Sequence, residues 1–195
     1  MSELELKKGI TVYCGSSAGR DPAYLEAAAA VGGEIARRHL PLYYGGGHMG
    51  MMGAVGKAVR KGGGTAVAVI PEFMVKRGWN DPEASATIIT GSMHERKNIM
   101  ASRAVGAIAL PGGVGTFEEL CEIITWRQLG LYDGNIVVLN TGGYYDPWIS
   151  QFRKAVDEGF YLESHLGLFA VTEDPCEAVA LAAADNGPAH IEPKF

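Results

Sequence analysis

Two glycine-rich segments carry the residue types best suited to holding a phosphate group. One covers residues 45–50 (Gly-Gly-Gly-His-Met-Gly) and the other residues 111–116 (Pro-Gly-Gly-Val-Gly-Thr), each between an expected strand and an expected helix. Glycine lets the backbone come close to a ligand, and the N–H groups at a helix N-terminus favour an anion. Either segment alone is as readily a tight turn, since such connections often need glycine. Together, at one edge of a sheet, they favour a phosphate held from two sides.

Two carboxylates follow the second glycine segment. Glu118 and Glu119 stand in the first turns of the helix expected there, where a carboxylate can meet a sugar attached to the phosphate. Neighbouring residues point about 100° apart on a helix, so we expect one of the two to face the ligand. The alternative is that these acids only interact favourably with the helix dipole.

A third segment holds residue types that could bind or act on a substrate. It is the run His94-Glu95-Arg96-Lys97 at the start of another expected helix. Cations in the first turn of a helix oppose its dipole, so Arg96 and Lys97 are poorly placed for stability alone. This favours contact between Arg96 and an anion or a substrate. Lys97 could equally lie on a solvated helix face, and His94 is expected at the periphery.

The first glycine segment also matches the pattern G-x-G-x-x-G through Gly45, Gly47 and Gly50. A dinucleotide site needs an acidic residue about 20 positions later to hold a ribose. Glu72 stands near that position but follows Pro71, so the match to an NAD site is partial. Neither glycine segment continues into Gly-Lys-Ser or Gly-Lys-Thr, which argues against a P-loop and ATP hydrolysis.

These segments are positioned by strands and helices that alternate along the chain. Short apolar runs predict strands at 10–14, 41–44, 65–70, 86–89, 107–110, 136–139 and 168–172. Longer patterns predict helices at 22–38, with Asp21 as the N-cap, and at 50–61, 93–103, 116–129, 147–158 and 175–184. This alternation is typical of an α/β fold.

The predicted architecture is therefore a single doubly wound domain over residues 1–195, with a mostly parallel sheet of six to seven strands and helices on both faces. Residues 1–8 and 185–195 are expected to be loose termini. In such a fold the ligand lies beyond the carboxyl ends of the strands, near the point where the strand order reverses. All three segments above are expected at that edge.

Composition narrows the class of protein. The 195 residues include 27 glycines, about twice the usual share, in a chain that is 47% hydrophobic, which argues against disorder. A net charge of -5 without a basic run argues against nucleic-acid binding, and no apolar segment reaches the ~20 residues of a membrane span. Cys14, Cys121 and Cys176 show neither disulfide nor metal spacing, so we expect a cytoplasmic protein without a metal site.

Three motifs resemble those of the LOG ("Lonely Guy") family. They are Gly45-Gly46-Gly47-x-x-Gly50-x-Met52-Gly53, Met93-His94-x-Arg96-Lys97 and Pro111-Gly112-Gly113-x-Gly115-Thr116-x-x-Glu119. Members are cytokinin riboside 5'-monophosphate phosphoribohydrolases, long labelled "possible lysine decarboxylase". The resemblance covers about residues 10–159. A loop at 131–135 departs from it, because a Lys-Pro pair would be expected before the next strand.

The resemblance implies a Rossmann-like fold and hydrolysis of the N-glycosidic bond of a nucleoside 5'-monophosphate. The products would be adenine or an N6-modified adenine and ribose 5-phosphate. Carried over by position, the catalytic pair is Arg96 and Glu119. The substrate-binding residues are Gly46, Gly47, Met93, Lys97, Gly112, Gly113, Gly115 and Thr116. The resemblance also implies a homodimer and no cofactor.

Several alternatives stay open. Arg96 could stabilise negative charge on the phosphate or on the departing base, and Met49, Met51 and Met52 could contact a base or fill the core. A nucleotide-binding or carrier module without turnover is possible on the same scaffold, because fold does not determine function. The decarboxylase label finds no support, since no lysine has a context that marks it for a Schiff base.

Overall fold

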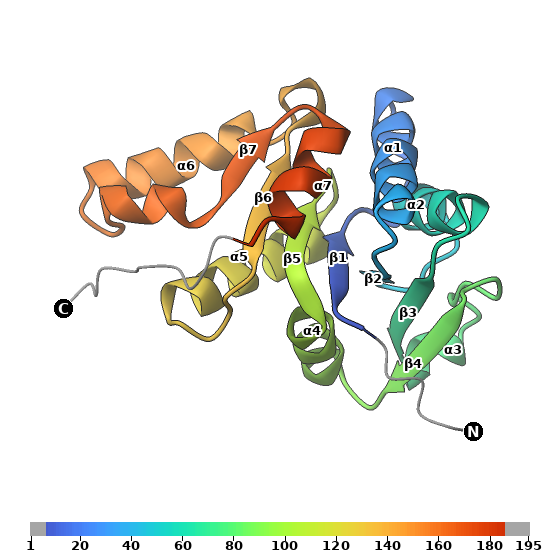
Figure 1. Ribbon diagram of the computed structural model, residues 1–195. Helices are drawn as coiled ribbons and strands as arrows, with labels where there is room; N and C mark the ends of the chain where they lie inside the picture. The colour runs from blue at the N-terminus through green and yellow to red at the C-terminus, as the bar shows by residue number, and fades with distance from the viewer. Residues whose placement is uncertain (1–6, 186–195) are drawn as a thin grey trace.

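A parallel sheet of seven strands forms the centre of the computed structural model, which describes residues 7–185 (Figure 1). The strands are β1 (Gly9–Tyr13), β2 (Leu42–Tyr44), β3 (Ala66–Pro71), β4 (Ala86–Thr90), β5 (Ala104–Ala109), β6 (Asn135–Leu139) and β7 (Ala170–Thr172). Their order across the sheet is β4-β3-β2-β1-β5-β6-β7. The chain thus builds outward from β1 to β4 and then returns to the other side of β1. This confirms the predicted doubly wound α/β architecture.

Helices cover both faces of the sheet. One face carries α1 (Ala23–Arg37), α2 (Gly50–Lys61) and α7 (Pro175–Ala183), and the other carries α4 (Met93–Ser102), α5 (Val114–Gln128) and α6 (Asp146–Asp157) (Figure 1). A short helix α3 (Glu72–Val75) and two 3-10 turns, η1 (Thr141–Gly143) and η2 (Glu163–Leu168), complete the described elements. No helix in residues 7–185 is both long enough and apolar enough to cross a membrane.

The central strand β1 shows how the sheet is held between the two helical layers. Ile10 and Val12 are buried against the layer of α1, whereas Tyr13 is buried against the layer of α5. This follows from the alternation of side chains along a strand. The polar Thr11 satisfies its buried hydroxyl by donating a hydrogen bond of 2.6 Å to the carbonyl of Met100 in α4. The central strand is therefore buried on both faces.

Two element boundaries next to the second glycine segment, residues 111–116, differ from the predicted ones. β5 begins at Ala104, three residues before the expected start, and its ladder with β1 shifts register between Gly9 and Ile10. α5 begins at Val114 rather than at residue 116, because Gly113 is its N-cap. Gly115 therefore lies within the first helical turn. Its low helix propensity had placed it before the predicted helix.

Other boundaries differ by one or two residues. α1 begins at Ala23 with Pro22 at the N-cap position instead of the predicted Asp21, whose carboxylate accepts a hydrogen bond of 2.9 Å from the Ala23 N–H. The final strand is shorter than predicted and begins at Ala170, because η2 ends at Leu168. The expectation of loose termini concerns residues that lie, apart from 7, 8 and 185, outside the described range.

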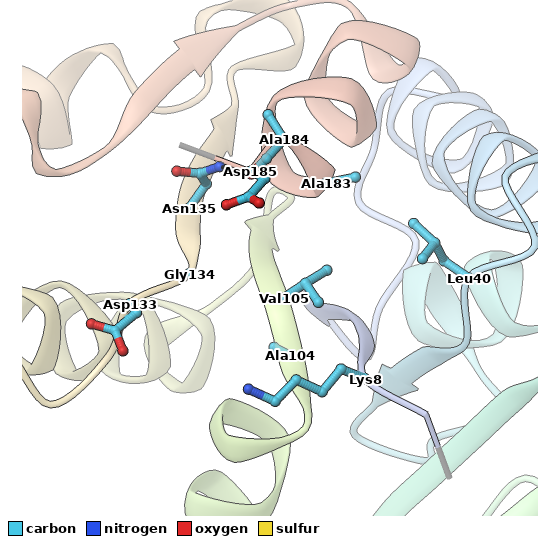
Figure 2. Close-up of a pocket in the computed structure, with 10 residues that line it drawn as sticks. All are labelled: Lys8, Leu40, Ala104, Val105, Asp133, Gly134, Asn135, Ala183, Ala184 and Asp185. Carbon is cyan, nitrogen blue, oxygen red and sulfur yellow. Dashed lines mark hydrogen bonds between the residues drawn. The ribbon is translucent and has the colours of Figure 1, made fainter. Parts of the chain in front are cut away.

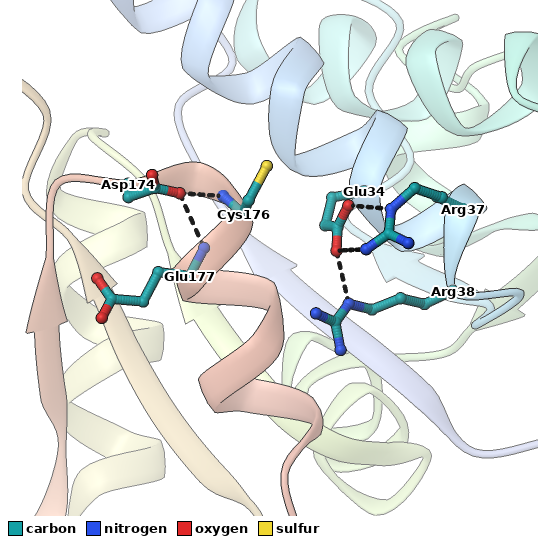
Figure 3. Close-up of polar contacts among 6 residues, drawn as sticks. All are labelled: Glu34, Arg37, Arg38, Asp174, Cys176 and Glu177. Atoms are coloured by element: carbon teal, nitrogen blue, oxygen red, sulfur yellow. Dashed lines mark hydrogen bonds and ion pairs between the residues drawn. The ribbon is translucent and has the colours of Figure 1, made fainter.

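The end of α1 lies beside the beginning of α7, and local polar contacts fix both ends (Figure 3). Glu34 pairs with Arg37 at 2.6 Å and with Arg38 at 2.7 Å, and the hydrogen bond from Arg37 lowers the Glu34 pKa to about 2. Asp174 caps α7, since its Oδ1 accepts hydrogen bonds from the N–H groups of Cys176 and Glu177 at 2.7 and 2.9 Å. These contacts are structural and lie away from the glycine segments.

Candidate active site

A pocket of about 260 Å3 opens at the carboxyl ends of β1, β2 and β5, where the strand order reverses. Ligands of doubly wound folds bind at this place. The pocket is lined by Val12, Cys14, Gly15, Ser16, Gly45, Met52, Met74, Met93, Arg96, Met100, Gly113, Gly115, Thr116, Glu118 and Glu119. It therefore brings together residues from all three segments that the sequence singled out.

Glu119 is the buried carboxylate of this pocket. The residue is 8% exposed, and its carboxylate accepts no hydrogen bond from the described residues. Burial raises its pKa to about 7, while the nearby charge of Arg96 acts in the opposite direction. At neutral pH the group is thus close to its midpoint of titration, a property common among catalytic carboxylates.

Arg96 faces Glu119 across the pocket. Its Nη2 lies 3.8 Å from Oε1 of Glu119, and its Nε donates a hydrogen bond of 3.1 Å to the carbonyl of Val69 at the end of β3. Gly45 makes room for the guanidinium, because a Cβ atom at that position would come within 2.0 Å of Nη2. The first glycine segment therefore contributes the space in which the arginine lies.

Lys97, the other cation of the run, is bound by carboxylates of the next helix. Its Nζ donates to Glu118 and, at 3.0 Å, to Glu122, which joins α4 to α5. Burial acts to lower its pKa, but the two carboxylates outweigh burial and raise it. Lys97 is not among the lining residues, so the run separates into one cation in the pocket and one between helices. The peripheral position expected for His94 is confirmed, since its side chain is exposed.

Both Glu118 and Glu119 border the pocket, which differs from the expectation that one of them would. The Glu118 carboxylate is directed to Lys97, and its side chain remains 54% exposed. Glu119 is buried beside Arg96. Helical geometry separates the two carboxylates as expected, but the pocket is wide enough to be bordered by both residues.

The N-terminus of α5 presents open hydrogen-bond donors. The N–H groups of Gly113, Val114 and Gly115 have no acceptor among the described residues, and all three residues are exposed. The first N–H groups of any helix lack intrahelical partners and attract anions. The buried Thr116 stands in the same turn, and its own N–H donates to the carbonyl of Gly113 at 3.0 Å. Glu119 follows one turn later on the same face of the helix.

The N-terminus of α2 is arranged differently, because two of its first donors already have partners in another segment. The N–H groups of Met51 and Met52 donate to the carbonyls of Ser17 and Gly15, each at 3.3 Å. Gly46 has a positive φ of 73°, and its carbonyl accepts a hydrogen bond of 2.6 Å from the Asp81 N–H. Gly47 pairs with Asn80 in an isolated antiparallel bridge. Of this triplet, Gly45 lines the pocket, whereas Gly46 and Gly47 are not among the lining residues.

Methionines form much of the apolar wall opposite these polar groups. Met52, Met74, Met93 and Met100 line the pocket, whereas Met51 is buried in the core and Met49 is 64% exposed. Sequence reasoning missed Met74 and Met100. Met74 comes from α3, in a segment without a regular pattern, and Met100 has the spacing of an ordinary buried helical residue. A flexible thioether wall can adapt to ligands of different shapes.

A larger hollow of about 540 Å3 lies at the opposite edge of the sheet, at the starts of β5 and β6 (Figure 2). Figure 2 shows its charged side chains, Lys8, Asp133 and Asp185, which come from the residue before β1, the loop before β6 and the segment after α7. It contains none of the predicted catalytic or substrate-binding residues. Parallel sheets bind ligands at the other edge, so the smaller pocket is the candidate site. Residues 7–185 hold no cluster of His, Cys, Asp or Glu suited to a metal ion.

Comparison with known proteins gives consistent matches over most of the chain. A family model described as "possible lysine decarboxylase" matches residues 52–182. A cytokinin riboside 5'-monophosphate phosphoribohydrolase from Arabidopsis thaliana is 46% identical over 153 residues, which are 78% of this chain and 70% of the relative. A probable enzyme of the same name from Oryza sativa subsp. japonica is 43% identical over 165 residues, covering 85% of this chain and 73% of the relative.

Solved structures also resemble this chain. The molybdenum cofactor carrier protein from Chlamydomonas reinhardtii is similar with a TM-score of 0.66 and 26% identity, over 89% of this chain and 94% of that protein. A molybdenum cofactor binding protein from Rippkaea orientalis has a TM-score of 0.67 at 21% identity, over 90% and 96% of the two chains. The latter shows the shared fold alone.

Proposed function

We propose that this chain, which belongs to the LOG family of cytokinin riboside 5'-monophosphate phosphoribohydrolases, hydrolyses the N-glycosidic bond of adenosine 5'-monophosphates, including N6-modified ones. One observation supports this most directly. A buried carboxylate, Glu119, faces a buried guanidinium, Arg96, one helical turn from the open donors of α5.

In this proposal the 5'-phosphate lies at the N-terminus of α5. The free N–H groups of Gly113 and Gly115, with the neighbouring Thr116, receive its oxygens. The helix dipole adds a favourable partial positive charge there. We do not assign direct phosphate contacts to Gly46, Gly47 or Lys97, because the two glycines do not line the pocket and the lysine is bound by two carboxylates.

The methionine wall then receives the base, and Glu119 acts at the ribose. The bond from C1' to the base nitrogen breaks with its electron pair going to the base, and positive charge develops on the ribose. The ionised Glu119 stabilises this charge and accepts a proton from the water that adds to C1', while the base takes up a proton from solvent. Arg96 favours the ionised form of Glu119.

A decarboxylase of the pyridoxal phosphate type fits the pocket poorly. Such an enzyme needs a lysine whose neutral amine forms a Schiff base. Lys97 is the lysine adjacent to the proposed catalytic arginine, and its two carboxylate partners raise its pKa and hold it protonated. Its charge therefore serves the contact between α4 and α5.

The proposal is tested by incubating the pure protein with AMP and with isopentenyladenosine monophosphate and separating the products by chromatography. Wild type should release the free base and ribose 5-phosphate, and it should act poorly on the nucleosides without phosphate. Glu119→Gln and Glu119→Ala should lower kcat by at least about 100-fold. Glu122→Gln, on the same helix but outside the pocket, is the matched control and should retain most of the activity.

A second candidate function, nucleotide or cofactor carriage without turnover, is favoured by the likeness to the carrier protein from Chlamydomonas reinhardtii. Tight binding of AMP by wild type without release of base would support carriage and overturn the hydrolase. Equal turnover by Glu119→Ala and wild type would also contradict the proposed mechanism.

We further propose that the protein is a cytoplasmic homodimer, as the family resemblance implies. Unpaired Cys14, Cys121 and Cys176 are compatible with a reducing compartment. Leu129 and Leu131, which are 63% and 70% exposed after the end of α5, are candidates for the apolar contact between subunits.

A further inference from the structure

Four consecutive carbonyl groups lead into the N-terminus of α5, and each has a donor. The carbonyl of Leu110 accepts a hydrogen bond of 2.7 Å from the Tyr145 hydroxyl, and that of Pro111 accepts one of 3.1 Å from the Gly15 N–H. The Gly112 carbonyl accepts from the Tyr144 hydroxyl. The Gly113 carbonyl accepts from the first turn of α5. Each carbonyl of this loop is thus held by a hydrogen bond.

The contact at Gly112 has a direct consequence for the pocket. The carbonyl of Gly112 and the N–H of Gly113 belong to one planar trans peptide group, in which they point in opposite directions. Holding the carbonyl on one side therefore holds the N–H on the other side, and Gly113 lines the pocket. A peptide between two glycines turns over easily, because neither residue restricts its dihedrals with a side chain. If it turned over, a carbonyl oxygen would face the phosphate where a donor is needed.

Tyr144 is itself fixed by the surrounding aromatic rings. Its ring stacks on Phe117 in α5, with centroids 6.3 Å apart and planes at 17°, and meets Tyr24 of α1 edge-on at 5.9 Å. Gly142 and Gly143, with φ of 61° and 70°, form the turn that precedes it. Its hydroxyl therefore reaches Gly112 from a rigid setting.

We infer that Tyr144 is a positioning residue that sets the orientation of the Gly112–Gly113 peptide and so presents the Gly113 N–H to the substrate phosphate. This inference rests on the proposed function for the identity of the ligand. Its effect acts through the backbone, because the Tyr144 hydroxyl is engaged with Gly112. Tyr145 differs in one respect, since the peptide that it holds ends at Pro111, which has no N–H to present.

The experiment measures binding of ribose 5-phosphate and of inorganic phosphate by calorimetry to wild type, Tyr144→Phe, Tyr145→Phe and Tyr161→Phe. Tyr144→Phe keeps the stacked ring and loses the hydroxyl, so it should weaken binding of both ligands about three- to ten-fold. Tyr161 is the matched control, because it is partly buried and donates to a backbone carbonyl, that of His165, at 3.2 Å outside the pocket. Tyr161→Phe and Tyr145→Phe should change binding less than two-fold.

Kinetics with AMP separate positioning from a general loss of structure. Tyr144→Phe should raise KM by the same factor as the ligand Kd, with kcat changed less than two-fold, since phosphate contacts bind substrate and transition state alike. Unchanged ligand binding in Tyr144→Phe, or an equal loss in Tyr161→Phe, would overturn the inference even if wild type is active. If wild type shows no turnover while Tyr144→Phe alone loses phosphate binding, the proposed function would be overturned and the inference would stand.

Discussion

At the scale of single residues, Glu119 is kept in surroundings that disfavour its charge. Burial raises its pKa to about 7, and Arg96 offsets that effect only in part. Since nearly all of its side chain is removed from water, the folded state resists ionisation that the unfolded chain accepts readily. A group selected for folding alone would not need this arrangement, which is typical of functional carboxylates.

This arrangement predicts that Glu119→Gln stabilises the protein at neutral and alkaline pH. The stabilising effect of a raised carboxyl pKa is complete below the ordinary value of 4.5 and is lost as the pH rises through about 7. Glutamine cannot ionise, so the variant should avoid this loss and gain on the order of 2–3 kcal/mol in free energy of unfolding at pH 8. The gain should shrink toward zero near pH 4.

The measurement is denaturant unfolding of wild type and Glu119→Gln at several pH values between 4 and 8. A difference in stability that stays constant over this range would contradict the raised pKa. A variant less stable than wild type at pH 8 would show instead that the contact with Arg96 outweighs the cost of burial. The same substitution is expected to lower kcat by at least about 100-fold. The ionisable carboxylate would then support activity while it lowers the free energy of unfolding.

At the scale of elements, the helix N-termini near the pocket differ in whether the protein's own groups occupy their first donors. Asp174 closes α7, and the carbonyls of Gly15 and Ser17 close α2. The first donors of α5 have no partner in residues 7–185, although their loop is braced from behind by Tyr144. Open donors at one helix terminus of the pocket are therefore a specific feature, and they lie where the substrate phosphate is proposed.

The closed termini should matter for stability and not for the reaction. Asp174→Ala removes the acceptor for two N–H groups at the start of α7, and we expect a loss of about 1 kcal/mol in free energy of unfolding. Glu173→Ala, at the exposed neighbouring position, is the control and should change stability by less than about 0.5 kcal/mol. Thermal unfolding and AMP turnover should be measured together. A loss of turnover in folded Asp174→Ala would contradict a purely structural role.

At the scale of the whole molecule, the pocket and the proposed subunit contact use opposite ends of α5. Leu129 and Leu131 follow the C-terminus of the helix, beside a hollow of about 400 Å3 lined by Asn98, Ala101, Ser102, Trp126, Leu131 and Tyr132. Burying one leucine side chain is worth roughly 1.5–3 kcal/mol. A subunit contact at this surface would remove both leucines from water.

Leu131→Asp is therefore expected to weaken dimerisation by at least about ten-fold, because it would bury a charge in place of an apolar side chain. Sedimentation velocity over a range of protein concentrations measures this effect. Phe160→Asp is the control, since Phe160 is 76% exposed after the end of α6, and it should leave the association constant unchanged. Wild type that stays monomeric at all concentrations would contradict the homodimer.

Much of the architecture could be predicted because it depends on local pattern. Apolar runs such as Val67–Ile70 must be buried on both faces, and their alternation with helices leaves few topologies other than a parallel doubly wound sheet. The predicted start of α5 at residue 116 was wrong by two residues, since the helix begins at Val114. Helix propensity treats glycine as a breaker and does not include the hydrogen bonds that the Gly113 carbonyl accepts.

The sequence by itself determined which residue types could do chemistry and at which edge of the sheet they would lie, since both follow from spacing along the chain. The tertiary structure decided how they are used. It directed Arg96 to Glu119 and Lys97 to Glu118 and Glu122, although the two cations are adjacent in sequence. It also decided that the first donors of α5 stay open whereas those of Met51 and Met52 in α2 do not, because only packing shows which carbonyls reach the N–H groups of a neighbouring element.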